Sequence, residues 1–175
     1  MSDEPGLDKQ AANMAGRTGL TPPEGYERMP EGLGFGDHLQ PFYRRIDAED
    51  VSFALRVDRQ HLNLMGVCHG GAMMTLADIA AASSIRVAGG RQAAIPTINL
   101  SFDFVSPGKP GAWLITRSDH VRVKRRFGFC SGAIWDEDTL VCRYSGTFYF
   151  PDAPPAGMDR DARERLDRLV GEGSS

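Results

Sequence analysis

The sequence has 175 residues, of which 41% are hydrophobic, and a formal net charge of −3 at pH 7. This length and this apolar content allow one domain with a full core and hardly two, so we expect one domain with tails. Because the net charge is slightly negative, the protein as a whole does not attract nucleic acid or an anionic membrane surface. An anionic ligand must therefore bind at a local cluster of positive charge.

The first segment, residues 1–34, is rich in Gly, Pro and charged residues and has little hydrophobic periodicity. This composition is typical of a mobile arm, in which we expect no catalytic residue. The chain begins Met1-Ser2-Asp3-Glu4, without the basic and apolar regions of a secretory signal, and no stretch has the length and apolarity to span a bilayer. We therefore expect a soluble, cytoplasmic protein that does not bind membranes.

Regular structure is predicted from residue 35 onward. Aromatic residues over 35–43 indicate a helical turn that covers a pocket. Apolar and polar residues alternate over 51–57, which is the pattern of a half-buried strand. The apolar run over 70–87 predicts a long helix that ends at Gly89-Gly90.

The second half of the sequence predicts an antiparallel sheet. Alternating patterns separated by short turns predict strands over 98–104, 113–123, 127–135 and 140–150. Consecutive hairpins make an antiparallel sheet, and the long apolar helix can bury itself only on the concave face of that sheet. The prediction is an α+β domain over 35–152, followed by a tail over 153–175 that is compatible with a short helix.

The cysteines, Cys68, Cys130 and Cys142, are odd in number and have no C-x-x-C spacing. The sequence therefore predicts neither a disulfide framework nor a structural zinc site, and we expect reduced, mostly buried thiols. Cys68 is next to His69, but adjacent residues point in different directions, which disfavours a nucleophile and base pair. Phosphate-binding glycine motifs are absent, so nucleotide-cofactor chemistry has no support in the sequence.

One acidic residue, Asp78, interrupts an otherwise uncharged run from His69 to Ile85. Burying an ionised carboxylate is costly unless it is paired or hydrogen-bonded, so a core helix rarely keeps one for packing alone. The alternative is a solvated helix face, but the flanking residues leave almost no polar face. We therefore interpret Asp78 as a reactive group.

The predicted helix begins with Gly70-Gly71. The first N–H groups of a helix lack intrahelical partners and carry the positive end of its dipole, so they can stabilise an oxyanion, and glycine lets a ligand approach them. The alternative is that the glycines only permit a tight turn. Asp78 lies about 12 Å further along the helix axis, so both groups reach one carbonyl only if two helices pack antiparallel in a dimer.

These residues also resemble a known family. The segment 63–71, NLMGVCHGG, followed by LAD at 76–78, resembles the hotdog-fold acyl-CoA thioesterases of the PaaI-like group. The segment 96–102 and the Ser-Pro turn at 106–107 extend the resemblance, which covers roughly residues 51–150. It implies a long central helix wrapped by a five- or six-stranded antiparallel sheet, a homodimer or dimer of dimers, and hydrolysis of acyl-CoA to a free acid and CoA. The hydrolysis that we expect uses no metal and no cofactor.

The resemblance also implies roles for individual residues. The Gly70 N–H would polarise the thioester carbonyl, and Asp78 of the facing subunit would act as general base or nucleophile. Asn63 would orient the carbonyl or the water, and Thr97 would hold the water or the Asp78 carboxylate. His69 belongs to the same set, either in proton transfer or in fixing its loop by a hydrogen bond.

The substrate is expected to bind at Gly71 and at the densest basic cluster of the chain, which consists of Arg122, Lys124, Arg125 and Arg126. Arginine suits bidentate contacts with the CoA phosphates. The alternative is a solvated edge that discourages strand pairing. Six residues are candidates either for an acyl pocket or for the core: Phe35, Phe42, Tyr43, Met65, Met73 and Met74.

Two other functions share this fold. Hotdog dehydratases carry an Asp and His pair in a motif that this sequence lacks. A non-catalytic acyl-CoA-binding or sensing protein is the second alternative, but the residues before 51 contain no helix-turn-helix, and the retained Asp78 favours catalysis. The sequence leaves open the acyl chain length and the choice between dimer and tetramer.

Overall fold

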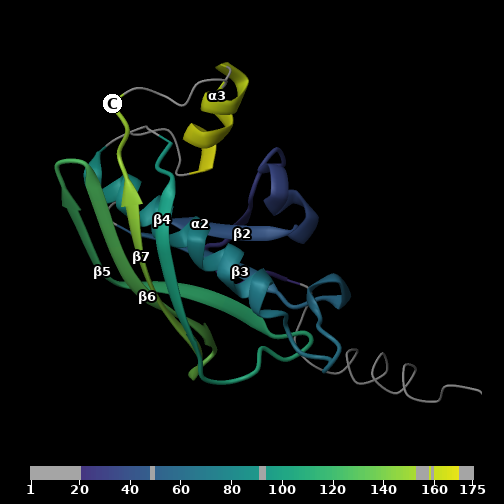
Figure 1. The fold of residues 1–175 in the computed structure, drawn as a ribbon. Coiled ribbons are helices and arrows are strands. Elements are labelled where there is room, and N and C mark those ends of the chain that lie inside the picture. The colour runs from purple at the N-terminus through teal and green to yellow at the C-terminus, as the bar shows by residue number, and fades with distance from the viewer. Residues whose placement is uncertain (1–20, 48–49, 91–93, 153–157, 159, 170–175) are drawn as a thin grey trace, which may run out of the picture.

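The computed structural model describes residues 21–47, 50–90, 94–152, 158 and 160–169. Its elements follow one another as β1 (Glu27–Arg28), the 3-10 helix η1 (Gly34–Leu39), β2 (Phe42–Ile46), β3 (Val51–Arg56), the 3-10 turn η2 (Arg59–His61), α2 (Gly70–Gly89), β4 (Thr97–Phe104), β5 (Trp113–Lys124), β6 (Phe127–Asp136), β7 (Thr139–Tyr149) and α3 (Arg160–Leu169) (Figure 1).

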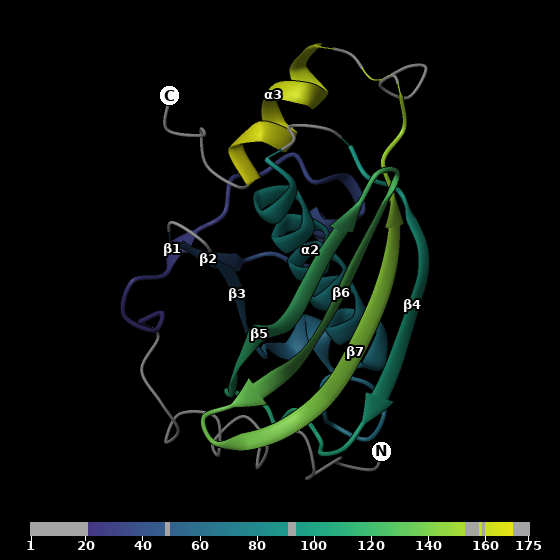
Figure 2. The same cartoon turned by 90° about the vertical axis from the view of Figure 1, so that its left-hand side faces the viewer.

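The strands form one antiparallel sheet in the order β1-β2-β3-β5-β6-β7-β4. Figure 2 shows β5, β6, β7 and β4 curving around α2, which confirms the predicted hotdog arrangement. The sheet has seven strands rather than five or six, because β1 and β2 precede the five predicted strands. The adjacent residues Arg44 and Arg45 break the polar and apolar alternation of β2, so its sequence does not read as a strand.

The buried face of α2 consists mostly of small residues, which let the sheet approach the helix closely. Its buried apolar residues are Ala72, Met73, Leu76, Ala77, Ala80, Ala81 and Ile85. On β6, a Cβ at Gly128 would lie 2.3 Å from Ile85 Cγ2, so this contact requires glycine. The helix ends at Gly89, and Gly90 caps it with a left-handed φ of 56°, as predicted.

Two segments outside the predicted domain pack against it. In the expected N-terminal arm, Tyr26 and Met29 are buried, and β1 pairs with β2. In the expected tail, α3 lies over the C-terminal half of α2, where the Arg86 side chain contacts Leu166 and Asp167 (Figures 1 and 2). Residues 1–20 of the arm, and 153–157, 159 and 170–175 of the tail, lie outside the described residues.

None of the helices in the described ranges combines the length and the apolarity that a bilayer crossing demands.

Candidate active site

The carboxylate of Asp78 lies in the middle of α2 and meets the first residue of β4. Thr97 Oγ1 donates a hydrogen bond of 2.7 Å to Asp78 Oδ1. Burial of the half-buried carboxyl raises the pKa of Asp78 above the usual 3.8, and the bond from Thr97 partly offsets this rise. Asp78 therefore binds a proton more tightly than an exposed aspartate does, which makes it a stronger general base.

At the start of α2, the N–H groups of Gly71, Ala72 and Met73 all donate to His69. His69 is the N-cap residue, and its Nδ1 accepts a hydrogen bond of 2.8 Å from Gly71 N. His69 thus fixes the helix start, and Gly71 N–H points at His69 rather than at a ligand. In the described part of the chain, no acceptor lies within hydrogen-bonding geometry of Gly70 N–H. Gly70 N–H is therefore the unengaged donor at the start of the helix.

The loop before the helix is ordered by Asn63. Its Oδ1 accepts hydrogen bonds from Met65 N at 2.9 Å and from Val67 N at 3.3 Å. These bonds leave the Asn63 Nδ2 amino group as the part of the side chain that can contact a carbonyl or a water. Asn63 thus orders the loop that leads into α2 and, among the described residues, keeps one amide donor unengaged.

One chain does not assemble all the predicted groups at one point. The structure pairs Asp78 with Thr97, and separately places His69 and Gly70 at the start of α2, with Asn63 in the loop that precedes it. Eight residues of helix separate Gly70 from Asp78, which corresponds to about 12 Å. The two groups of residues therefore lie apart within one chain.

A groove of about 350 Å³ opens beside Asp78. The segment before and within η1 forms one side through Leu33 and Phe35, and Leu166 of α3 lies on the other side. Sequence analysis included Phe35 among the candidates for an acyl pocket but missed Leu166. The pattern of the tail indicates a helix, but it contains no information on where that helix docks.

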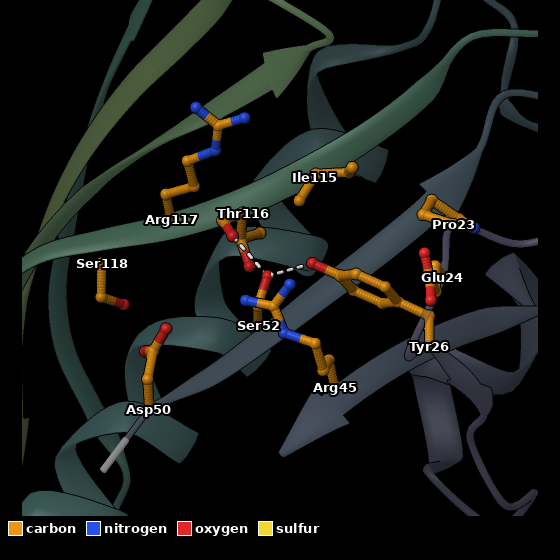
Figure 3. A pocket seen from close by; sticks show the side chains of 10 residues that line it. All are labelled: Pro23, Glu24, Tyr26, Arg45, Asp50, Ser52, Ile115, Thr116, Arg117 and Ser118. Atoms are coloured by element: carbon orange, nitrogen blue, oxygen red, sulfur yellow. Dashed lines mark hydrogen bonds between the residues drawn. The ribbon is translucent and has the colours of Figure 1, made fainter. Parts of the chain in front are cut away.

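A second cavity, of about 370 Å³, lies between β3 and β5 (Figure 3). The Ser52 hydroxyl fills its inner side, where it donates a hydrogen bond to the Thr116 carbonyl and meets the Tyr26 hydroxyl, each at 2.6 Å. These polar groups satisfy one another, and none of the predicted site residues lines the cavity. The groove beside Asp78 is thus the better candidate for the substrate site.

The predicted basic cluster divides between two environments. Arg122 and Lys124 are exposed at the end of β5, and they pair in register with Phe129 and Phe127 of β6, whose rings are also exposed. Directly paired residues share one face of an antiparallel sheet, so this face presents two cations beside two aromatic rings. Arg125 occupies the hairpin turn.

Arg126 makes contacts within the protein. Its guanidinium forms an ion pair with Asp152 and lies 5.4 Å from the centroid of the Tyr149 ring. Arg126 is therefore less available to a phosphate than Arg122 and Lys124 are.

The cysteines are buried, as expected. Burial raises the pKa of Cys68 to about 12, of Cys130 to about 11 and of Cys142 to about 12. These thiols carry almost no thiolate at neutral pH, which argues against Cys68 as a nucleophile. Within the described ranges, no three His, Cys, Asp or Glu side chains are grouped so that they could hold a metal ion.

Comparison with known proteins yields consistent relatives. The sequence pattern of the thioesterase superfamily matches residues 65–143. The Pseudomonas aeruginosa protein named "Putative esterase PA0474" is 31% identical over 130 residues, which are 74% of this chain and 97% of that protein.

Solved structures have the same fold. The TT0310 protein of Thermus thermophilus superposes with a TM-score of 0.60 at 25% identity, over 69% of this chain and all of that chain. A variant of the phenylacetic acid degradation protein PaaI from the same organism superposes with a TM-score of 0.59 at 25% identity, over 67% of this chain and 99% of that chain. Thioesterase superfamily member 2 of Mus musculus superposes with a TM-score of 0.60 at 20% identity, over 68% of this chain and 89% of that chain. At this identity the similarity shows a common fold only.

Proposed function

The chain belongs to the thioesterase superfamily, and we propose that it hydrolyses acyl-CoA thioesters to a free acid and CoA with Asp78 as the reactive group. The observation that carries this proposal is the hydrogen bond from Thr97 to a half-buried carboxylate of raised pKa beside a groove. Active sites are where such perturbed groups gather. The reaction needs no metal and no cofactor.

In the proposed mechanism, Asp78 accepts a proton from a water molecule as the water oxygen attacks the thioester carbonyl carbon. The oxyanion of the tetrahedral intermediate accepts a hydrogen bond from Gly70 N–H, and Asn63 Nδ2 orients the carbonyl or the water. The C–S bond then breaks, and the departing thiolate takes the proton from the Asp78 carboxyl group. The same placement serves direct attack by Asp78 followed by hydrolysis of the anhydride.

The site is proposed to be shared between two subunits. Strand β4 is an edge of the sheet, and its exposed side carries Ile98, 57% exposed, and Phe104, 54% exposed. A long apolar edge strand is suited to pairing with another chain. Gly70 lies against the Phe104 ring, so the start of α2 belongs to the same edge. Antiparallel pairing of two β4 strands would bring Gly70 of one subunit towards Asp78 of the other, in a homodimer or in each half of a dimer of dimers.

The direct test is release of free thiol from acetyl-, octanoyl-, palmitoyl- and benzoyl-CoA. We expect turnover of at least one of these substrates, and the profile over the panel would define the acyl group. Tight binding without turnover of any of them would contradict hydrolysis and favour the sensing alternative.

The Thr97 hydroxyl is expected to set the pH dependence. Because Asp78 must be ionised to act and its pKa is raised, kcat/KM should fall as the pH decreases through a pKa above 3.8. Thr97→Val removes the bond that lowers this pKa, so the acidic limb should move to higher pH. Thr139→Val, in an exposed hairpin, is the control and should leave the profile unchanged. An unshifted limb in Thr97→Val would show that Asp78 does not define it.

The exposed cations Arg122 and Lys124 are proposed to bind the CoA phosphates. Replacing both with Gln should raise KM for acyl-CoA about 10-fold, since two charged contacts are lost, and should leave KM for the matching N-acetylcysteamine thioester unchanged. The control is the double change Arg28→Gln and Lys109→Gln, which alters net charge equally at other exposed positions. Equal KM changes for both substrates would place the phosphates elsewhere.

A further inference from the structure

The tail helix α3 forms a wall of the groove beside Asp78. Met158, Ala162, Arg165 and Leu166 all line this groove. Ala162, Arg165 and Leu166 are spaced by three and one residues and share one face of α3, and Met158 precedes the helix. Leu33 and Phe35 line the groove from the N-terminal side, and α2 contributes Thr75 and Ile79 beside Asp78. Two segments far apart in sequence thus enclose the space next to the proposed reactive carboxylate.

A buried arginine holds α3 in place. Arg86, near the C-terminal end of α2, is 3% exposed. It donates a hydrogen bond of 2.7 Å to the Leu166 carbonyl and forms an ion pair of 3.3 Å with Asp167. A buried charge without its partner is costly, so Arg86 favours the docked position of α3. This anchor includes the Leu166 carbonyl, so it holds the main chain of α3 at the residue whose side chain lines the groove.

From this arrangement we propose that Leu166 is a specificity-determining residue and that the groove holds the acyl group of the substrate, selecting apolar acyl groups larger than acetyl. This inference rests on the proposed hydrolysis of acyl-CoA. The volume of about 350 Å³ is at the lower end of small-molecule sites.

The chemistry of the walls distinguishes the acyl group from the rest of the thioester. With the carbonyl carbon at Asp78, the groove can receive either the acyl group or the pantetheine arm. The amide groups of pantetheine would lose hydrogen bonds to water between Leu33, Ile79 and Leu166, whereas an apolar acyl group gains from burial there. Both outer walls lie outside residues 65–143, the part that matches the sequence pattern of the superfamily.

The test compares a bulky substitution inside the groove with the same substitution outside it. Leu166→Trp fills the groove, whereas Arg163→Trp adds the same side chain at an exposed position of α3. For each variant, kcat/KM is measured with acetyl-CoA and octanoyl-CoA, and Kd is measured with the corresponding non-hydrolysable thioether analogues.

We expect Leu166→Trp to lower the octanoyl to acetyl ratio of kcat/KM by about 10-fold or more, because several methylene groups lose their pocket. Arg163→Trp should keep the wild-type ratio, and Leu166→Ala should raise the relative rate with bulkier acyl groups. A ratio unchanged in both Leu166 variants, or changed equally by Arg163→Trp, would overturn the inference while hydrolysis stands.

Absence of turnover by the wild type would contradict the proposed function instead. The ratio of Kd values for the two analogues would then decide the inference, since it reports the groove without any chemical step. A selective loss of octanoyl affinity in Leu166→Trp supports the acyl assignment, and an unchanged ratio contradicts it.

Discussion

Asp78→Asn is expected to lower kcat about 10²-fold or more, because the amide can neither accept a proton from water nor attack the carbonyl. The substitution preserves the shape of the side chain and keeps an oxygen that can accept the 2.7 Å hydrogen bond from Thr97. The measurement is free thiol release at saturating substrate. A rate within about threefold of the wild type would remove Asp78 from the mechanism.

The effect of this variant on stability has a defined sign. Because burial raises the pKa of Asp78, the folded state binds a proton more tightly than the unfolded state. Stability therefore falls as pH rises from the usual aspartate pKa through the raised one, and the cost persists at neutral pH. Asn carries no charge, so Tm of Asp78→Asn at pH 7 should equal or exceed that of the wild type.

The matched control is Asp138→Asn, in the exposed hairpin between β6 and β7. This change removes the same charge away from the groove and should leave both kcat and Tm unaltered. A loss of activity in Asp78→Asn together with a lower Tm would indicate damage to the fold rather than to the chemistry.

Local patterns account for most of what the sequence predicted correctly about the fold. The alternation over 51–57 and the apolar run over 70–87 each depend on residues that are close in sequence, and the structure contains β3 and α2 there. The strand β2 was missed because Arg44 and Arg45 are neighbours on an outer strand, where both faces tolerate polar residues. Its pairing with β3, rather than its own pattern, makes it a strand.

In the candidate site, too, local sequence signals reveal single residues but not the contacts that the fold makes between them. The uncharged neighbours of Asp78 mark it in the sequence, but its contact with Thr97 depends on where the sheet places β4. Strand β4 pairs with β7, which follows it by more than 30 residues, so no local signal indicates the contact. Only the family resemblance suggested Thr97.

The groove is less accessible still to sequence reasoning. Leu166 lies at the groove because Arg86 binds the Leu166 carbonyl and Asp167, which are some 80 residues further along the chain. In the sequence, Arg86 and Asp167 cannot be distinguished from two unrelated surface charges. The basic cluster, in contrast, could have been divided in advance, because strand alternation alone places Arg122 and Lys124 on one face.

Dimers that combine two inactive variants are expected to regain activity if the site is shared between subunits. In Gly70→Val, the new Cβ would lie 2.9 Å from Phe104 Cζ, at the tip of a half-exposed ring that can move, and the side chain would block access to the Gly70 N–H. Loss of one oxyanion donor costs about 10²–10³ in kcat. Homodimers of Gly70→Val and of Asp78→Asn should therefore both be nearly inactive.

A mixed dimer of these two variants contains one site with an intact Gly70 from one subunit and an intact Asp78 from the other. Co-expression with two different affinity tags and sequential purification isolates it, and thiol release should recover to about half of the wild-type rate per dimer, because one of two sites is complete. The matched control pairs a wild-type subunit with one that carries both changes. Each of its composite sites then lacks one group, so it should stay inactive. If a single subunit contained the whole site, the two results would be reversed, since the mixed dimer of single variants would be inactive and the control would retain half of the rate.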